Sequence, residues 1–217
     1  ITVGSYTSGA GILQADGVNY NNGYITFQTS SSGVIDGCKF VNSELRFKDQ
    51  SNPQVINNIF DTNTKLRFNS ESKLTRISCN DYGSKKMYIN FDVSKNLTIK
   101  NIPNVDYYLE GGFSVISGAK LTIESGVNLY CQNNSITVGS YTSGAGILQA
   151  DGVRLNSCSL IDQVSSEALI TRCSLQNSPI VIKDNALFKI TNTNLDIFSK
   201  VDNRTTKIVD AKNNYWG

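Results

Sequence analysis

The chain has 217 residues, 18% of them charged, a formal net charge of +2 and no histidine. A nearly neutral chain lacks the basic surface that attracts nucleic acid or anionic membranes, so neither is expected as a partner. Without histidine, the commonest general base and metal ligand is missing from the possible catalytic groups.

The composition favours short strands joined by turns. The sequence contains 25 Asn, 25 Ser and 17 Gly against 3 Pro and 1 Met, and β-branched and aromatic residues are common. No window shows a long apolar period of about 3.6 residues, which argues against helices. No apolar run reaches roughly 18 residues, so no membrane insertion is expected.

The first predicted strands, "ITV" (1–3) and "ILQA" (12–15), flank a Gly-rich turn. The whole stretch ITVGSYTSGAGILQADGV (1–18) returns without change at 136–153. The same offset of 135 continues without a gap from 19–65 to 154–200, where 13 of 47 pairs are identical. We therefore interpret residues 1–217 as one continuous solenoid in which 1–83 match 136–217 and the bridging coils are 84–135.

A shorter period runs inside each copy. Along the chain, short apolar stretches with alternating character recur every 18 to 26 residues; examples are VIDGCKF (34–40), VINNIF (55–60), LTIESGVNL (121–129), LITRCSL (169–175) and LFKITNTNL (187–195). Each is too short for a helix and suits a strand with one face inward. A period of this length indicates a repeat solenoid.

Two solenoid folds have this period. Leucine-rich repeats need an L-x-x-L-x-L-x-x-N framework with a helical half, and the sequence has neither. A parallel β-helix needs short strands, turns rich in Gly, Asn, Ser and Asp, and like residues stacked from coil to coil. The prediction is an all-β, single-stranded parallel β-helix of about ten coils, right-handed by the general rule for parallel crossovers.

Two segments carry a family resemblance: YYLEGGFSVISGAKLTIESGVNLYCQNNSITVGSYTSGAGILQADGV (107–153) and AKNNYWG (211–217). They resemble repeats of right-handed parallel β-helix proteins of the pectate-lyase-like superfamily that bacteria secrete or display at the cell surface. The resemblance implies the fold and a secreted or cell-surface location. It implies no particular activity, because that group includes lyases, hydrolases and adhesin-like stalks.

Five cysteines form no CxxC pair; they are Cys38, Cys79, Cys131, Cys158 and Cys173. A zinc site is therefore not expected, and neither is any other metal or cofactor. The odd number leaves at least one thiol unpaired. Most of the five are expected to be small buried side chains, although which of them pair stays open.

Asparagines are expected at the coil corners. Asn57, Asn192, Asn58 and the pair Asn213 and Asn214 follow short apolar stretches. Asparagine tolerates left-handed backbone angles, and its side-chain amide can hydrogen-bond to the next coil. These residues are predicted to have a structural role.

No catalytic residue is predicted. The chain has no Asp-Asp pair and no Gly-His-Gly of the polygalacturonase type, and its acidic residues are scattered. A lyase would need a carboxylate cluster with an Arg or Lys base. Arg76 and Arg172 are the two bases considered, and neither has an acidic companion in its own stretch.

Five aromatic residues are candidate ligand contacts: Tyr6, Tyr141, Tyr107, Tyr108 and Trp216. Tyr6 and Tyr141 stand in the two copies of the Gly-rich turn, and aromatic side chains suit sugar faces and protein partners alike. The competing interpretation is that each tyrosine folds over its own turn. For Trp216, it is that the side chain packs as a plug that ends the repeated module.

The expected function is a non-catalytic part of a modular secreted or surface-displayed bacterial protein that is adhesin-like or contacts a glycan. The expected partner is a polysaccharide or a host or cell-surface glycan, and the chain is expected to be a monomer. One alternative is a polysaccharide lyase or glycoside hydrolase acting along a groove. The other is a purely structural stalk.

Overall fold

The computed structural model describes residues 1–5, 10–28, 30–48, 51–68, 77–78, 80–82 and 86–217. It is a parallel β-solenoid of about 10 turns with no helix in these residues, which confirms the predicted all-β solenoid. Contacts divide the chain into two compact units, Ile1–Asn90 and Phe91–Gly217. Nothing in the described part of the chain forms a helix that could cross a membrane.

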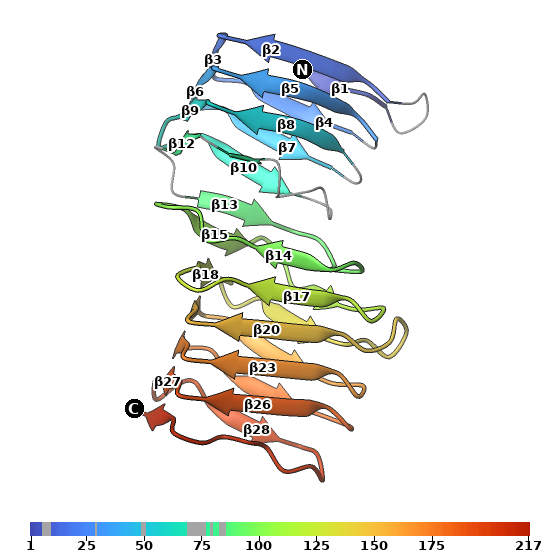
Figure 1. Ribbon diagram of the computed structural model, residues 1–217, viewed down its shortest axis with the longest axis vertical. Coiled ribbons are helices and arrows are strands. Elements are labelled where there is room, and N and C mark those ends of the chain that lie inside the picture. The colour runs from blue at the N-terminus through green and yellow to red at the C-terminus, as the bar shows by residue number, and fades with distance from the viewer. Residues whose placement is uncertain (6–9, 29, 49–50, 69–76, 79, 83–85) are drawn as a thin grey trace. The chain divides into compact units, whose positions relative to one another are not determined.

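In residues 1–90, successive turns add one strand to each of three parallel sheets (Figure 1). The first sheet contains β2 (Ile12–Asp16), β5 (Ser32–Asp36), β8 (Asn52–Ile56) and β11 (Ile77–Ser78). The second contains β3 (Asn19–Asn21), β6 (Lys39–Val41), β9 (Ile59–Phe60) and β12 (Asp81–Tyr82). The third contains β1 (Thr2–Val3), β4 (Tyr24–Phe27), β7 (Glu44–Phe47), β10 (Lys65–Phe68) and β13 (Lys86–Ile89).

Residues 91–217 repeat this plan. One sheet contains β14 (Leu97–Ile99), β17 (Lys120–Ile123), β20 (Ile147–Asp151), β23 (Glu167–Thr171) and β26 (Leu187–Thr191). A second contains β15 (Asp106–Leu109), β18 (Asn128–Tyr130), β21 (Arg154–Asn156), β24 (Ser174–Gln176), β27 (Asn194–Leu195) and β29 (Tyr215–Trp216). A third contains β16 (Phe113–Val115), β19 (Ser135–Val138), β22 (Ser159–Asp162), β25 (Ile180–Ile182) and β28 (Val201–Asn203).

The core consists of like residues stacked from turn to turn. Alternate residues of each strand point inward, and the parallel register puts Phe27, Phe47 and Phe68 in one column. The rings of Phe27 and Phe47 are 5.9 Å apart and those of Phe47 and Phe68 are 4.9 Å apart, both stacked. Such columns bury the apolar face of each turn against its two neighbours.

The two identical stretches form the same strands in different surroundings. β20 lies between β17 and β23, where Leu148 is buried and Ile147 is half-buried. β2 pairs with β5 at the end of its sheet, where the equivalent Leu13 is half-buried and Ile12 is 75% exposed. Gly11 and Gly146, equivalent in the two copies, both lie so close to other backbone atoms that a Cβ would overlap them. Packing therefore explains why glycine stands there, although it does not explain the identity of the whole stretch.

The apolar stretches bend where single strands were expected. VIDGCKF, for example, covers the end of β5, a corner at Gly37 and Cys38, and the start of β6. Gly37 and Asn57 have left-handed φ angles of 59° and 56°, which turn the chain between two strands. The inward alternation continues through the corner because Cys38 and Asn58 point into the core. A pattern of period two therefore cannot reveal the bend.

The corner asparagines have the predicted structural role. Asn57, Asn192 and Asn213 adopt left-handed φ angles. Asn58 is fully buried, accepts a hydrogen bond from the Cys38 backbone N–H at 2.9 Å and donates to the carbonyl oxygens of Ile35 and Ile56. Its side chain thus links one turn to the preceding one.

Substitution of Asn58 by alanine is expected to lower the free energy of unfolding by about 2 kcal/mol, because it leaves the buried Cys38 N–H without its acceptor and removes the two hydrogen bonds that Asn58 donates to carbonyl oxygens. Urea unfolding of the whole chain measures the change. Asn57→Ala is a poor control because of its φ angle, whereas Asn57→Gly preserves the corner and is expected to change stability little. A change below about 0.5 kcal/mol for Asn58→Ala would contradict the structural role.

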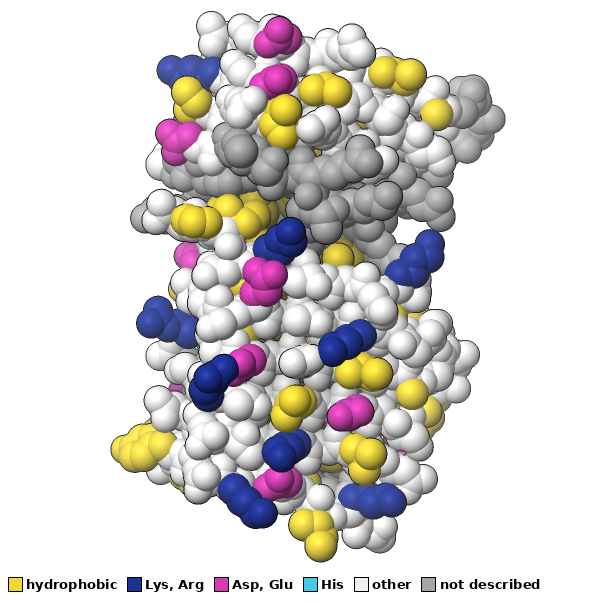
Figure 2. Space-filling view, in the orientation of Figure 1, with side chains coloured by type: hydrophobic (Ala, Val, Ile, Leu, Met, Phe, Trp, Pro, Cys, Tyr) yellow, Lys and Arg dark blue, Asp and Glu magenta, His cyan; other side chains and the backbone are white. Residues whose placement is uncertain are grey.

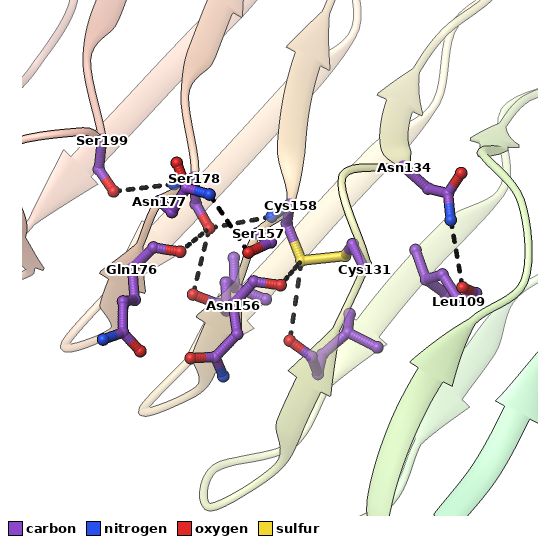
Figure 3. Close-up of a disulfide and its surroundings, with 12 residues drawn as sticks. Leu109, Cys131, Asn134, Asn156, Ser157, Cys158, Gln176, Asn177, Ser178 and Ser199 are labelled. Atoms are coloured by element: carbon purple, nitrogen blue, oxygen red, sulfur yellow. Dashed lines mark hydrogen bonds between the residues drawn. A yellow bond between two sulfur atoms is a disulfide. The ribbon is translucent and has the colours of Figure 1, made fainter.

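A disulfide joins Cys131 and Cys158, whose Cα atoms are 4.8 Å apart at one corner of adjacent turns (Figure 3). Further along this corner, the Cys158 N–H donates to the Ser178 hydroxyl at 3.1 Å and the Ser178 N–H donates to that of Ser199 at 3.0 Å. The disulfide thus occupies a place where other turns are linked by hydroxyl hydrogen bonds.

The prediction that most cysteines are small buried side chains is confirmed for Cys38, Cys131, Cys158 and Cys173. The pairing, which the sequence left open, joins Cys131 to Cys158, because the coil register stacks these two at one corner, and Cys38 and Cys173 are free. Cys79 lies outside the described residues. Burial raises the pKa of Cys173 to about 11, so its thiol is unreactive near neutral pH.

Candidate functional site

A groove of about 620 Å³ lies on the outer surface of the sheet that contains β21, β24, β27 and β29. Its floor consists of outward-facing polar residues from these strands, and one side consists of the segment that follows β27. A cavity of this size is in the range that accommodates a small molecule or a few sugar units.

The floor is built by the parallel register. Arg154 pairs with Ser174, Ser174 with Asn194 and Asn194 with Tyr215, which puts one residue of each strand in a single row. Asn156 and Gln176 form a neighbouring row. The buried leucine between these rows, such as Leu175 in β24, holds each strand on the core.

The amides of the floor are available to a ligand. Within the described residues, the side chains of Asn156, Gln176 and Asn194 make no hydrogen bond, and Figure 3 shows Asn156 and Gln176 pointing away from the disulfide corner. Each amide carries both a donor NH₂ and an acceptor oxygen. Such a floor can donate to and accept from the hydroxyl groups of one ligand.

Exposed apolar side chains border the floor. Ile197, Phe198 and Tyr215 are 63%, 61% and 68% exposed. Asp196 holds the turn that carries Phe198, because its carboxylate accepts hydrogen bonds from the Phe198 N–H and the Ser199 hydroxyl and, from the preceding turn, the Asn177 N–H. Partial burial raises the pKa of Asp196, but these hydrogen bonds hold it below its ordinary value. The loop is therefore fixed by a charged group at neutral pH.

Tyr141 is the most exposed of the predicted contacts that the structure describes. It is 70% exposed, and its turn is closed by two backbone hydrogen bonds between Ser140 and Gly144. The hydroxyl does not fold over its own turn, because it donates to Asp184 at 2.8 Å, 43 residues further along the chain. This hydrogen bond raises the pKa of Tyr141. Tyr6, its equivalent, lies outside the described residues.

The other predicted contacts have different surroundings. Tyr107 is a core residue, 1% exposed, with its hydroxyl donating to the Lys100 carbonyl oxygen at 2.7 Å, so its side chain does not reach the surface. Tyr108 is half-buried and stacks on Tyr130 with 4.9 Å between the ring centroids. Trp216 pairs with the buried Leu195, is 52% exposed at the end of that column and is not among the residues that line the groove.

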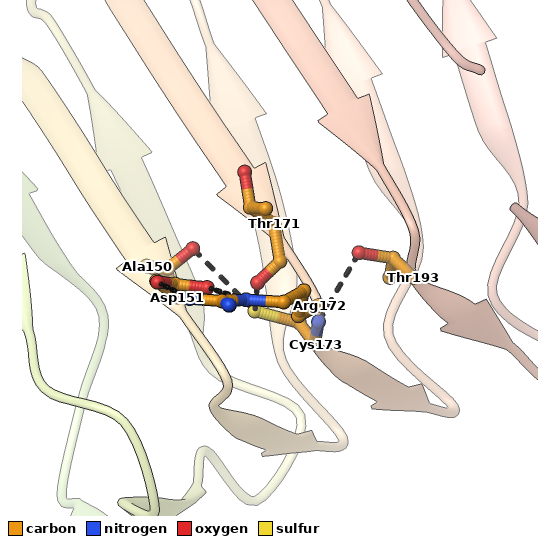
Figure 4. A network of polar contacts seen from close by, with 6 residues as sticks. All are labelled: Ala150, Asp151, Thr171, Arg172, Cys173 and Thr193. Carbon is orange, nitrogen blue, oxygen red and sulfur yellow. Dashed lines mark hydrogen bonds and ion pairs between the residues drawn. The ribbon is translucent and has the colours of Figure 1, made fainter. Parts of the chain in front are cut away.

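Arg172 has an acidic partner in the preceding turn. Its guanidinium forms a bidentate ion pair with the Asp151 carboxylate (Figure 4). Hydrogen bonding to Asp151 raises the pKa of Arg172 further, so it is a cation and not a base. Arg76 lies outside the described residues. Groups of three or more His, Cys, Asp or Glu that could hold a metal do not occur in the described ranges.

Another sheet has side chains of both charges on its outer face. Figure 2 shows the face over β17, β20, β23 and β26, where Lys and Arg side chains alternate with acidic and hydrophobic ones. Lys189, for example, pairs with Asp210 at 3.1 Å. This mixed face resembles an ordinary solvated surface.

The groove was not predicted from the sequence, although Tyr215, which lines it, is the neighbour of the candidate contact Trp216 in the chain. The missed signal is a short motif with a central leucine, RLN at 154–156 and SLQ at 174–176, spaced by 20 residues. That spacing equals one turn and puts the polar residues of the two motifs in common rows. Comparison with known protein families, curated proteins and solved structures found no match.

Proposed function

We propose that this chain is a non-catalytic, glycan-contacting part of a secreted or cell-surface bacterial protein, a right-handed β-helix of the pectate-lyase-like superfamily. The groove over β21, β24 and β27 carries the proposal, because unpaired amides on its floor and exposed aromatic residues at its edge suit the hydroxyls and apolar faces of sugars. The superfamily assignment rests on the resemblance of residues 107–153 and 211–217.

The disulfide supports the location. Disulfides persist in oxidising environments and are rare in the cytosol. Cys131 and Cys158 belong to adjacent turns and are bonded in the core of the corner, so the bond is part of the fold and not an exposed redox pair.

The enzyme alternative needs two or more carboxylates converging with an arginine in one groove. Arg172 contacts the single carboxylate of Asp151. Among the described side chains that line the groove, the one carboxylate is that of Asp196, which already accepts hydrogen bonds from its own turn. We therefore favour binding over cleavage as the function of the groove.

The test is a glycan-array screen of the whole chain, followed by titration of any hit. Gln176→Ala combined with Tyr215→Ala is expected to weaken binding at least about ten-fold, a loss of roughly 1.4 kcal/mol. The matched control is Gln149→Ala, which removes an outward-facing amide from β20, outside the groove. Oligosaccharide release from a bound glycan would establish the enzyme alternative, and no binding to any glycan would favour the structural stalk.

A further inference from the structure

A second surface with a distinct chemistry lies on the outer face of β4, β7, β10 and β13, in residues 1–90. We call it the cation-aromatic face and define it by six residues: Tyr24, Glu44, Arg46, Lys65, Arg67 and Tyr88. The register places Tyr24, Glu44 and Lys65 in one row. It places Arg46, Arg67 and Tyr88 in the adjacent row.

A single carboxylate positions both arginines. Glu44 Oε1 lies 2.6 Å from the Nε atoms of Arg46 and of Arg67. Partial burial raises the pKa of Glu44, but the hydrogen bond from Arg46 and the charge of Arg67 hold it below its ordinary value. Glu44 is therefore ionised at neutral pH and fixes the two guanidinium groups side by side on the sheet.

Tyrosine rings flank the two guanidinium groups. The Cζ atom of Arg46 lies 5.6 Å from the ring centroid of Tyr24, and that of Arg67 lies 5.1 Å from the ring centroid of Tyr88. The Nζ atom of Lys65 is 5.8 Å from the Tyr88 ring. These distances are those of cation–π contacts, which hold long cationic side chains against the surface. Tyr24 nevertheless remains 55% exposed.

Positive charge is concentrated on this face. Its six residues include three cations and one carboxylate, and Lys86, exposed at the start of β13, extends the same face next to Lys65. Cations therefore outnumber the carboxylate among these residues, and the cation-aromatic face would attract a polyanion.

The dimensions favour an extended ligand. Neighbouring strands lie about 4.8 Å apart, so the face from β4 to β13 extends over about 14 Å across three strand spacings. The outward-facing side chains of successive turns form rows that run from strand to strand. A linear polymer running from turn to turn can meet a charged or aromatic group at every step.

We infer that the cation-aromatic face binds a linear sulfated polysaccharide. A sugar ring can lie on a tyrosine while its sulfate, which projects from the ring through an ester oxygen, reaches the neighbouring guanidinium or ammonium group. Sulfate esters and guanidinium groups both stay charged across the physiological pH range. This site is separate from the groove over β21, β24 and β27 and does not depend on its function.

The test compares dextran sulfate with unsulfated dextran in titrations of the whole chain at low and moderate salt. We expect binding of dextran sulfate that weakens with salt, and no binding of dextran. Arg46→Ala combined with Arg67→Ala should weaken binding at least ten-fold. The matched control, Arg172→Ala combined with Arg204→Ala, also removes two exposed ion-paired arginines but lies outside this face, and it should change affinity less than three-fold.

Glu44→Gln keeps the inference testable if the arginine variants fail to fold. Gln keeps a side-chain oxygen that can accept from the arginines but removes the negative charge of Glu44, so dextran sulfate should bind several-fold more tightly, a gain that misfolding cannot produce. The inference would be overturned by an unchanged affinity in Glu44→Gln, by equal losses in the two double-arginine variants, or by equally tight binding of polygalacturonate or single-stranded DNA.

Discussion

Ionisation of the buried Asp162 is expected to lower the free energy of unfolding as the pH rises from about 4 to 7, and Asp162→Asn is expected to abolish this decrease. Asp162 is 1% exposed and stands in an inward column between Val138 and Ile182. Neither of its carboxylate oxygens has a hydrogen-bond partner in the described part of the chain. At the equivalent position of the first copy stands Phe27, which packs in the core.

The sign and size of the effect follow from the pKa. Burial, with a smaller contribution from the charge of Glu167, raises the pKa of Asp162 from 3.8 to about 7. The folded chain therefore binds this proton more tightly than the unfolded chain does. The stabilisation of the folded chain by this proton is fully present below about pH 3.8 and is lost as the pH rises through 7. Its size is about 1.4 kcal/mol per unit of pKa difference, or about 4 kcal/mol in total.

The measurement is urea unfolding of wild type and Asp162→Asn at pH 4, 6 and 8. Other carboxylates, such as Asp61, have lowered pKa values and act in the opposite direction, so the difference between the two proteins is the informative quantity. Between pH 4 and 8, the free energy of unfolding of Asp162→Asn should rise by about 4 kcal/mol relative to that of wild type. Asp16→Asn, an exposed control, should follow wild type. Parallel curves for wild type and Asp162→Asn would contradict a buried titrating carboxyl.

The fold could be predicted because local sequence patterns determine it. Short alternating stretches and a recurring spacing predict a solenoid, and asparagines after those stretches predict its corners. It was harder to predict which individual residues face the core and which face the solvent. Ile12, Leu187 and Ile208 begin apolar stretches, yet they are 75%, 55% and 95% exposed. An alternating pattern shows that one face is apolar but does not say which residue of a short stretch starts it.

The two proposed binding surfaces could not be predicted because they depend on register between turns. The near-identical motifs ELRF (44–47) and KLRF (65–68) differ in position by 21 residues. Once β7 and β10 are known to pair in register, the two arginines become neighbours and Glu44 lies between them. A repeat with variable turn lengths does not fix that register from the sequence alone. The candidate aromatic residues were instead chosen singly, and Tyr107 among them belongs to the core.

Reduction of the Cys131–Cys158 disulfide is expected to lower the free energy of unfolding by about 3 to 4 kcal/mol. The bond closes a loop with a sequence separation of 27, and in the chain-entropy description such a crosslink stabilises by restricting the unfolded chain. The folded state itself should change little, because serine hydroxyls occupy the same corner in later turns and make the equivalent links, as Ser178 and Ser199 do.

The test combines a reductant with Cys131→Ser and Cys158→Ser in one protein. Wild type should lose 3 to 4 kcal/mol when reduced, and the double variant should match reduced wild type and not respond to reductant. Alkylation of the unfolded monomer of a Cys79→Ser variant should label two more thiols after reduction than before. Cys38→Ser, which alters a buried free thiol, should leave the response to reductant intact. If reduction leaves the stability of wild type unchanged, the two turns are held together by their hydrogen bonds and packing alone, and the disulfide would no longer support a secreted or cell-surface location.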